Sequence, residues 1–293
     1  MQPARFVMSR DNSSESATNA LAGKPRDRRK HPRMINKQAH IEIFCLGHLA
    51  LRTDPKSAPT PLKRNSQPTA LLQLLVTAGP IGIDKAEVEL KLWPHAQIEL
   101  ADNTLDTTLY RLRKILGDHR AIEVDNGIVR LNENHAWVDA WNFAGEAETF
   151  CTRMKSTVRA LAPKEIDAHC DRLFDLYRGH FLAMDVATPW IVQTRDALQS
   201  KFFRAIKLTG ARWQTLRDWN RATQLYERAL ELDNLAEEIH RELMLCHLAQ
   251  HEFAAVVNVF RRCRELLSLV LGVAPSEATE KVYRQALAQQ SVL

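Results

Sequence analysis

The sequence predicts a multidomain protein in which a small α+β domain is followed by an all-α domain of helical repeats. Three observations support this fold class. The chain has 293 residues, enough for two domains that each bury a core. Residues 39–138 contain short strand patterns, three helical patterns and a hairpin signal. From residue 139 onward the pattern is almost wholly helical and is similar to itself at a spacing of 34 residues.

The charge of the chain is concentrated in a basic tail at residues 1–38. Ser, Asn, Arg, Lys and Pro dominate this tail, so it buries too little apolar surface to offset ordering entropy, and we expect it to be disordered. Residues 1–39 hold nine Lys and Arg against three Asp and Glu, whereas residues 40–138 have a net charge of −1 and residues 139–293 have none. The tail is either an electrostatic arm for DNA phosphates or a plain solvated segment.

Composition and motifs argue against several classes of protein. No stretch reaches the roughly 18 apolar residues of a membrane span, and no secretory signal is recognisable, so we expect a cytoplasmic protein without membrane contact. The five cysteines never form Cys-x-x-Cys, which favours reduced, buried thiols. Phosphate-binding glycine loops and His-Glu-x-x-His are absent, so we expect no enzyme activity, no cofactor and no metal.

Residues 40–94 predict a strand meander followed by two helices. Apolar residues alternate on either side of Gly47, which indicates short antiparallel strands, and a further extended piece follows Pro59. Ser66 is the expected N-cap of a helix that stops at Gly79-Pro80. Asp84 starts a second helix, which ends at Trp93-Pro94 because the residue before a proline is disfavoured in the helical conformation.

A third helix at about 103–116 and a hairpin at about 122–131 complete the first domain. Gly117 closes the helix as a C-cap. The Asn126-Gly127 pair tolerates the positive φ angles of a two-residue hairpin turn. The helix buries a leucine stripe formed by Leu105, Leu109, Leu112 and Leu116. Strands, three helices and a terminal hairpin is the order of a winged helix.

The face of the third helix opposite the leucine stripe is expected to meet solvent or DNA. Threonine can contact a thymine methyl group or a phosphate, and arginine can bind guanine O6 and N7. An ordinary solvated face has the same spacing, so both interpretations remain open. We expect Arg113 and Asp106, on the flank, to pair with neighbours. The candidate residues are Thr104, Thr107, Thr108, Arg111 and Lys114.

This region resembles the OmpR-type winged helix as it occurs in SARP-like activators. The resemblance rests on Leu90-x-Leu92-Trp93-Pro94, on Leu105 to Leu109, and on Arg111-Leu112-Arg113-Lys114-Ile115-Leu116-Gly117. It implies that the third helix enters the major groove of double-stranded DNA and that the hairpin is a wing. The implied DNA contacts are Thr107, Thr108, Arg111 and Lys114, with Asn126 and Arg130 on the wing. Ile128 and Val129 stand where many members have an aromatic residue.

The 34-residue spacing of the second domain is that of the tetratricopeptide repeat. Tyr226 is equivalent to Phe260, and Gly210 fills a small packing position in the first repeat, whereas Asn234 replaces the usual terminal proline. The second repeat is degenerate. The other equivalent pairs are Trp213 with His247, Ala222 with Val256, and Ala229 with Cys263.

Residues 139–293 also resemble the bacterial transcriptional activator domain. With the winged helix, the resemblance covers residues 40–288, and it implies a domain for dimerisation or for contacts with RNA polymerase or another protein. We expect a linker between the domains, so that the fragment 40–138 folds alone. The supporting motifs are Tyr177-x-Gly179-x-Phe181-Leu182, Trp190, Arg195-x-x-Leu198, Glu238-x-His240-Arg241-x-Leu243-Met244 and Leu271-Gly272-Val273-x-Pro275-Ser276.

Two alternatives remain beside the expected sequence-specific DNA-binding activator. The first is a metal site at His240, His247 and His251 beside Cys246, although His240 and His247 also match packing positions of the repeats. The second is a repeat-domain adaptor whose winged helix no longer binds DNA. The nearly neutral charge of residues 40–138 keeps this second alternative open.

Overall fold

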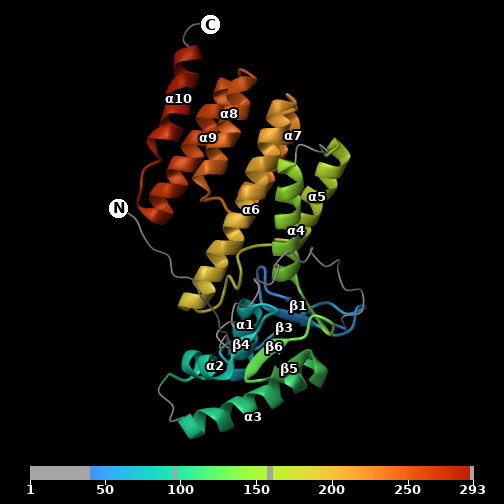
Figure 1. Ribbon diagram of the computed structural model, residues 1–293. Coiled ribbons are helices and arrows are strands. Elements are labelled where there is room, and N and C mark those ends of the chain that lie inside the picture. The colour runs from blue at the N-terminus through green and yellow to red at the C-terminus, as the bar shows by residue number, and fades with distance from the viewer. Residues whose placement is uncertain (1–39, 95–97, 157–160, 291–293) are drawn as a thin grey trace, which may run out of the picture. The chain divides into compact units, whose positions relative to one another are not determined.

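The computed structural model describes residues 40–94, 98–156 and 161–290 (Figure 1). The basic tail predicted at residues 1–38 lies outside these described residues. None of the described helices is long and apolar enough to cross a membrane. The described chain begins with a small region that contains all of its named strands and continues as a mostly helical region.

The first sheet joins the beginning and the end of the strand-containing region. Its order is β3-β2-β1-β7, and the pairs are antiparallel except for β1 and β7, which are parallel. Ile43 lies opposite both Leu51 and Val138, and all three are buried. The predicted meander is confirmed. The strands are β1 (Ile41–Phe44), β2 (Ala50–Arg52), β3 (Thr60–Pro61) and β7 (Ala136–Val138).

Three helices follow the meander. The first two start at the capping residues that the sequence indicates, whereas the third starts at Ile98, earlier than the predicted residue 103. The Ser66 side chain accepts a hydrogen bond from the Thr69 N–H, and the Asp84 carboxylate accepts one from the Ala86 N–H. The helices are α1 (Gln67–Ala78), α2 (Lys85–Leu92) and α3 (Ile98–Leu116).

The predicted hairpin is formed by β5 (Ile122–Asp125) and β6 (Ile128–Leu131), after a short 3-10 turn at His119–Ala121. Asn126 and Gly127 make the two-residue turn with φ angles of 49° and 80°. Strand β4 (Ile83–Asp84) pairs with β6, so the hairpin is the greater part of a three-stranded sheet. Gly82 permits this pairing, because a Cβ there would lie 2.7 Å from the Val129 carbonyl oxygen.

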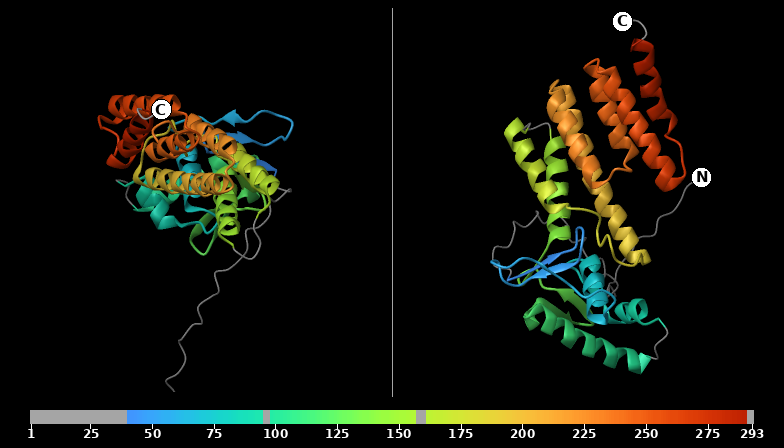
Figure 2. Two further views of the ribbon diagram at one scale, coloured as in Figure 1. Left: turned by 90° about the horizontal axis from the view of Figure 1, so that it is seen from above. Right: turned by 180° about the vertical axis from the view of Figure 1, so that it is seen from behind.

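The rest of the chain is a series of helices, and in both views of Figure 2 the later ones run side by side. Each of the pairs α6 with α7 and α8 with α9 is in direct contact, and α10 covers α8 and α9. The helices are α4 (Asp139–Lys155), α5 (Pro163–Leu176), α6 (Pro189–Thr215), α7 (Trp219–Leu232), α8 (Glu237–Ala249), α9 (Phe253–Leu266), a π-helical turn η2 (Leu267–Leu271) and α10 (Glu277–Gln290).

The residues that repeat after 34 positions are buried in two successive helix pairs. Tyr226 and Phe260 are both core residues, on α7 and α9. A Cβ at Gly210 would lie 1.9 Å from the Tyr226 hydroxyl, so the glycine makes room for the tyrosine between α6 and α7. His247 departs from the pattern, since its ring binds Glu252 at 2.6 Å.

No linker separates the strand-containing region from the helices, and the expectation of one is wrong. Strand β7 ends at Val138, and α4 begins at Asp139. The buried Asp139 carboxylate accepts hydrogen bonds from the backbone N–H groups of Cys45 at 2.9 Å and Leu46 at 3.0 Å, directly after β1. Burial raises the pKa of Asp139, although these hydrogen bonds oppose the shift.

A second segment of the helical region binds the same loop. The Leu182 N–H donates to the Cys45 carbonyl at 2.8 Å, and the Gly47 N–H donates to the His180 carbonyl at 3.0 Å. Arg195 of α6 holds this segment, because its guanidinium donates to the carbonyls of Phe181 and Leu182. The loop after β1 is therefore fixed from two sides.

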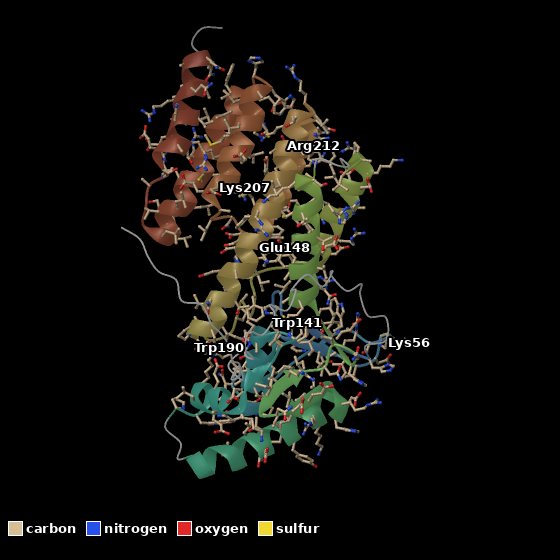
Figure 3. All side chains as sticks on the ribbon, in the orientation of Figure 1. Lys56, Trp141, Glu148, Trp190, Lys207 and Arg212 are labelled. Carbon is tan, nitrogen blue, oxygen red and sulfur yellow. The ribbon has the colours of Figure 1, made fainter. Side chains whose placement is uncertain are left out.

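Side chains complete the connection between the two regions. The Trp141 Nε1–H of α4 donates to the Val76 carbonyl in α1 at 2.8 Å (Figure 3), and Gln73 donates to Asp185 at 2.7 Å. One continuous group of buried apolar residues extends from β1 to α8, and a smaller second group lies among α8, α9 and α10. The fragment 40–138, which we expected to fold alone, would lose all of these partners.

We predict that Gly210→Ala destabilises the protein by about 1–3 kcal/mol, because the new methyl group collides with Tyr226. Gly145 in α4 is the matched control, since a Cβ there meets open space. Replacing a helical glycine by alanine typically adds about 0.5–1 kcal/mol of stability. Urea unfolding followed by circular dichroism measures both variants, and an equal response of the two would contradict the packing argument.

We predict that Asp139→Asn lowers the free energy of unfolding by about 1–3 kcal/mol, because the amide cannot accept from every N–H that the carboxylate binds. Asp175→Asn is the control, since Asp175 is exposed near the end of α5. The free energies of unfolding come from urea titration of the full chain. A loss for Asp139→Asn no larger than that for Asp175→Asn would show that the Asp139 contacts are dispensable.

Candidate nucleic-acid interface

Helix α3 is the element on which the sequence places most of the candidate residues, and its inner face is fixed in the core. All four residues of the predicted leucine stripe are buried, which confirms that prediction. Arg113 donates from its guanidinium to the Ile122 carbonyl at 3.1 Å, so it attaches α3 to β5 rather than facing solvent. Asp106 lies 3.9 Å from the Lys85 ammonium group. Both flanking residues pair with neighbours, as expected.

The turn after α3 is held by Asp118. Its carboxylate accepts hydrogen bonds from the Arg120 guanidinium and N–H and contacts the His135 ring at 3.0 Å. Hydrogen bonds from Arg120 contribute most to lowering the pKa of Asp118 to about 2. The carboxylate therefore stays charged near neutral pH and fixes the path from α3 to β5.

Three of the five predicted candidates are exposed on the outer face of α3. Thr107, Arg111 and Lys114 are exposed and follow one another at helical spacing. Thr104 is half-buried. This arrangement presents a guanidinium, an ammonium group and a hydroxyl on one side of the helix, which is suitable chemistry for phosphates and base edges.

The expectation that Thr108 lies on the exposed face is wrong. The residue is only 2% exposed, and its hydroxyl donates to the Thr104 carbonyl at 2.7 Å. Thr108 stands next to the leucine stripe along the helix, between Leu105 and Leu112, so it turns toward the core. Its hydroxyl therefore has its hydrogen-bond partner within the same helix, as Ser and Thr hydroxyls often do.

Tyr110 belongs to the outer face and was missed by sequence reasoning. It is 68% exposed, although tyrosine is an amphipathic residue that often buries its ring. Its spacing was the available signal, because it lies three residues after Thr107 and four before Lys114. The outer face, defined here as Thr107, Tyr110, Arg111 and Lys114, therefore includes an aromatic ring with a hydroxyl group.

The two hairpin candidates have different surroundings. Asn126 is exposed at the tip of the turn, where its backbone has a positive φ. Arg130 is half-buried and paired, since its guanidinium donates to the Glu123 carboxylate at 2.8 Å across the two strands. Glu123 also accepts from Asn132. Only Asn126 thus presents an uncommitted side chain at the hairpin tip.

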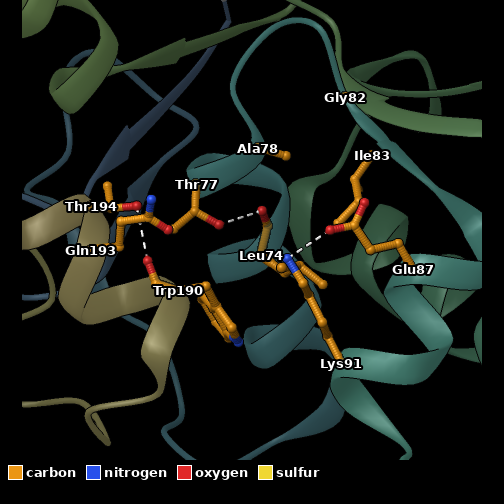
Figure 4. Close-up of a pocket in the computed structure, with 10 residues that line it drawn as sticks. All are labelled: Leu74, Thr77, Ala78, Gly82, Ile83, Glu87, Lys91, Trp190, Gln193 and Thr194. Atoms are coloured by element: carbon orange, nitrogen blue, oxygen red, sulfur yellow. Dashed lines mark hydrogen bonds and ion pairs between the residues drawn. The ribbon is translucent and has the colours of Figure 1, made fainter.

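A cavity of about 200 Å³ lies between α1, α2, β4 and the start of α6 (Figure 4). Typical ligand pockets measure about 300–1,000 Å³, so this one is small. Lys91, its one lysine, is paired with Glu87 at 2.8 Å. The Thr194 hydroxyl turns back to the Trp190 carbonyl, and the Thr77 hydroxyl to the Leu74 carbonyl. The cavity offers little for a ligand to bind.

The histidines that suggested a metal site do not converge. His240 is buried, and its Nε2 contacts the Asn234 carbonyl at 2.9 Å, while His247 binds Glu252. Burial lowers the pKa of His240. Among the described residues no group of three or more potential ligands is placed to hold a metal ion.

Comparison with solved structures identifies a similar fold. The chain is similar to Mycobacterium tuberculosis EmbR, which was solved in complex with a low affinity phosphopeptide. The TM-score is 0.60 at 17% sequence identity, and the match covers 85% of this chain. This chain spans 65% of the length of that EmbR chain. At this identity the likeness concerns the fold alone, and no curated protein matches the sequence.

A family model gives the remaining identification. The model of the bacterial transcriptional activator domain matches residues 138–287, which is just over half of the 293-residue chain. The match begins at the last residue of β7 and includes helices α4 to α9 and most of α10. It confirms the family resemblance to SARP-like activators that the sequence motifs indicated. The chain belongs to the bacterial transcriptional activator domain family.

Proposed function

We propose that the chain is a sequence-specific regulator of transcription that binds double-stranded DNA and acts as an activator in the cytoplasm. Residues 39–138 would be an OmpR-type winged helix, and residues 139–293 a tetratricopeptide-like domain for protein contacts. The observation that carries the proposal is the outer face of α3. Its four side chains point away from a helix whose other side is anchored in the core.

The outer face can both read bases and bind the DNA backbone. The Arg111 guanidinium has the geometry to donate two hydrogen bonds to a guanine in the major groove, which typically contributes about 1–3 kcal/mol of discrimination. Lys114 is one turn further along and suits a phosphate. Thr107 can contact a thymine methyl group, and the Tyr110 hydroxyl can donate to a phosphate oxygen. Thr108 has no part in this proposal because it is buried.

The hairpin would act as the wing, with Asn126 at its tip donating to the DNA backbone. Arg130 has a weaker case, since binding a phosphate would require it to leave Glu123. The pairing of Arg130 with Glu123 also neutralises the arginine of the hairpin, which leaves less positive charge for DNA phosphates. This observation favours the alternative of an adaptor that does not bind DNA. Protein bound at the DNA would then contact RNA polymerase, another protein or a second copy of the chain through the helical region.

We predict that Arg111→Ala weakens binding to a selected DNA sequence by about 1–3 kcal/mol and binding to random DNA much less, because a base-reading arginine supplies discrimination. Arg261→Ala is the matched control, since Arg261 is exposed on α9 and has no role in the proposed interface. Fluorescence anisotropy with both DNAs at one salt concentration measures the effect. Equal losses on both DNAs would make Arg111 a phosphate contact only.

We predict that removing residues 1–38 flattens the dependence of DNA affinity on salt concentration, because each phosphate-neutralising cation adds about −0.9 to the logarithmic slope for B-DNA. Residues 1–39 supply nine of the 40 Lys and Arg residues of the chain. Anisotropy titrations of the full and shortened chains across a salt series give the two slopes. Identical slopes would leave the tail without a role at the phosphates.

A further inference from the structure

The segment that follows α9 presents an unusual run of exposed apolar side chains. Leu269 is 85% exposed and Val270 is 59% exposed, and Leu271 and Val273 are also exposed. We call these four residues the η2 patch. Single exposed apolar residues are common, whereas a contiguous set marks a site of interaction.

The backbone of this segment is ordered by hydrogen bonds, so the exposure is a property of the fold. Leu267, the first residue of the π-helical turn, is buried directly after the end of α9. The turn ends at Gly272, whose φ is 68°, and its N–H donates to the Ser268 carbonyl. The Val273 N–H donates to the Leu267 carbonyl. Irregular turns of this kind are often found at functional sites.

Basic side chains precede the patch on the same helix. Arg261, Arg262 and Arg264 are all exposed, and within the part of the chain that the structure describes they have no ion-pair partner. Glu265 is the acidic residue among them. The end of α9 that precedes the patch therefore has more arginines than carboxylates, although the helical region as a whole, residues 139–293, has no net charge. A ligand that covers the apolar residues gains further from carboxylates near these arginines.

We propose that the η2 patch and the three arginines dock a short amphipathic segment of a partner protein, one that combines leucine-type side chains with carboxylates. This proposal rests on the proposed function and gives the partner contact of the helical region a place and a chemistry. The small number of exposed apolar residues, four, favours a short segment over a second copy of the chain. The largest apolar patch on a typical monomer measures about 300–600 Å², whereas a standard stable interface buries about 800 Å² on each partner.

Charge also disfavours the other occupants. Two copies meeting at the patch would bring two sets of three arginines together, which costs free energy through like-charge repulsion. Interfacial membrane segments combine basic residues with aromatic anchors, but residues 261–277 contain no aromatic residue and no lysine.

Two synthetic peptides test the proposal with the full-length protein. Each has leucines on one helical face, and the remaining positions are glutamate in the first peptide and lysine in the second. We expect the glutamate peptide to bind the wild type. Two double variants should bind it about tenfold more weakly. The first, the serine variant, combines Leu269→Ser with Val270→Ser, and the second combines Arg261→Glu with Arg262→Glu. Leu216→Ser is the control, since Leu216 is exposed near the end of α6 and its change should leave binding intact.

Several outcomes would overturn the proposal. They are no binding of the glutamate peptide at millimolar concentration, equal binding of the lysine peptide, and unchanged binding by both double variants. Flotation with anionic phospholipid vesicles, lost in the serine variant, would assign the patch to membranes instead. A concentration-dependent dimer in sedimentation, lost in the same variant, would assign it to a second copy.

The DNA affinity of the same proteins separates this proposal from the proposed function. We expect the serine variant to keep the affinity of the wild type for a selected DNA sequence, because the patch lies on η2 and α3 is untouched. Loss of peptide binding with intact DNA binding supports the docking surface. Peptide binding by a wild type that binds no DNA would refute the regulator while leaving the docking surface in place.

Discussion

The carboxylate of Asp139 joins the two regions of the molecule at one buried point. Asp139 is the first residue of α4, and its carboxylate accepts hydrogen bonds from N–H groups of the loop after β1 and of its own helix. An aspartate so deeply buried is costly unless its lone pairs are satisfied, and here backbone donors satisfy them. The arrangement sets the direction in which α4 leaves the first sheet, and the later helices are built on α4.

This constraint matters for the proposed function because α3, the helix proposed to face DNA, and the helical region then share one framework. Helix α3 packs on α1, the Val76 carbonyl of α1 accepts from Trp141 of α4, and α4 packs against α6. A partner held by the helices would be positioned with respect to the outer face of α3 through these contacts. Such coupling needs no flexible connection, which agrees with the direct continuation of β7 into α4.

Features that depend on neighbouring residues could be predicted from the sequence. Ser66 and Asp84 cap helices, Asn126 and Gly127 form the hairpin turn, and the leucine stripe of α3 is buried, each because the signal lies within a few residues. The family was also predictable, since its motifs extend along most of the chain.

Features that depend on distant parts of the chain escaped the same reasoning. The role of Asp139 could not be predicted, because its partners at Cys45 and Leu46 are more than 90 positions away. Thr108 was placed on the wrong face since it stands at the margin of the leucine stripe, where small changes of helix rotation decide burial. Tyr110 was missed because aromatic residues are usually assigned to cores.

The most direct test of the central claim places a photoreactive group on the outer face of α3. Azidophenylalanine at position 110 resembles the tyrosine that it replaces, and the same group at position 216 is the control, because both native side chains are exposed. Each variant is mixed with genomic DNA fragments and illuminated. If the chain binds DNA as proposed, covalent DNA adducts form from position 110 and none form from position 216. Absence of adducts from position 110, or equal adducts from both positions, would contradict it.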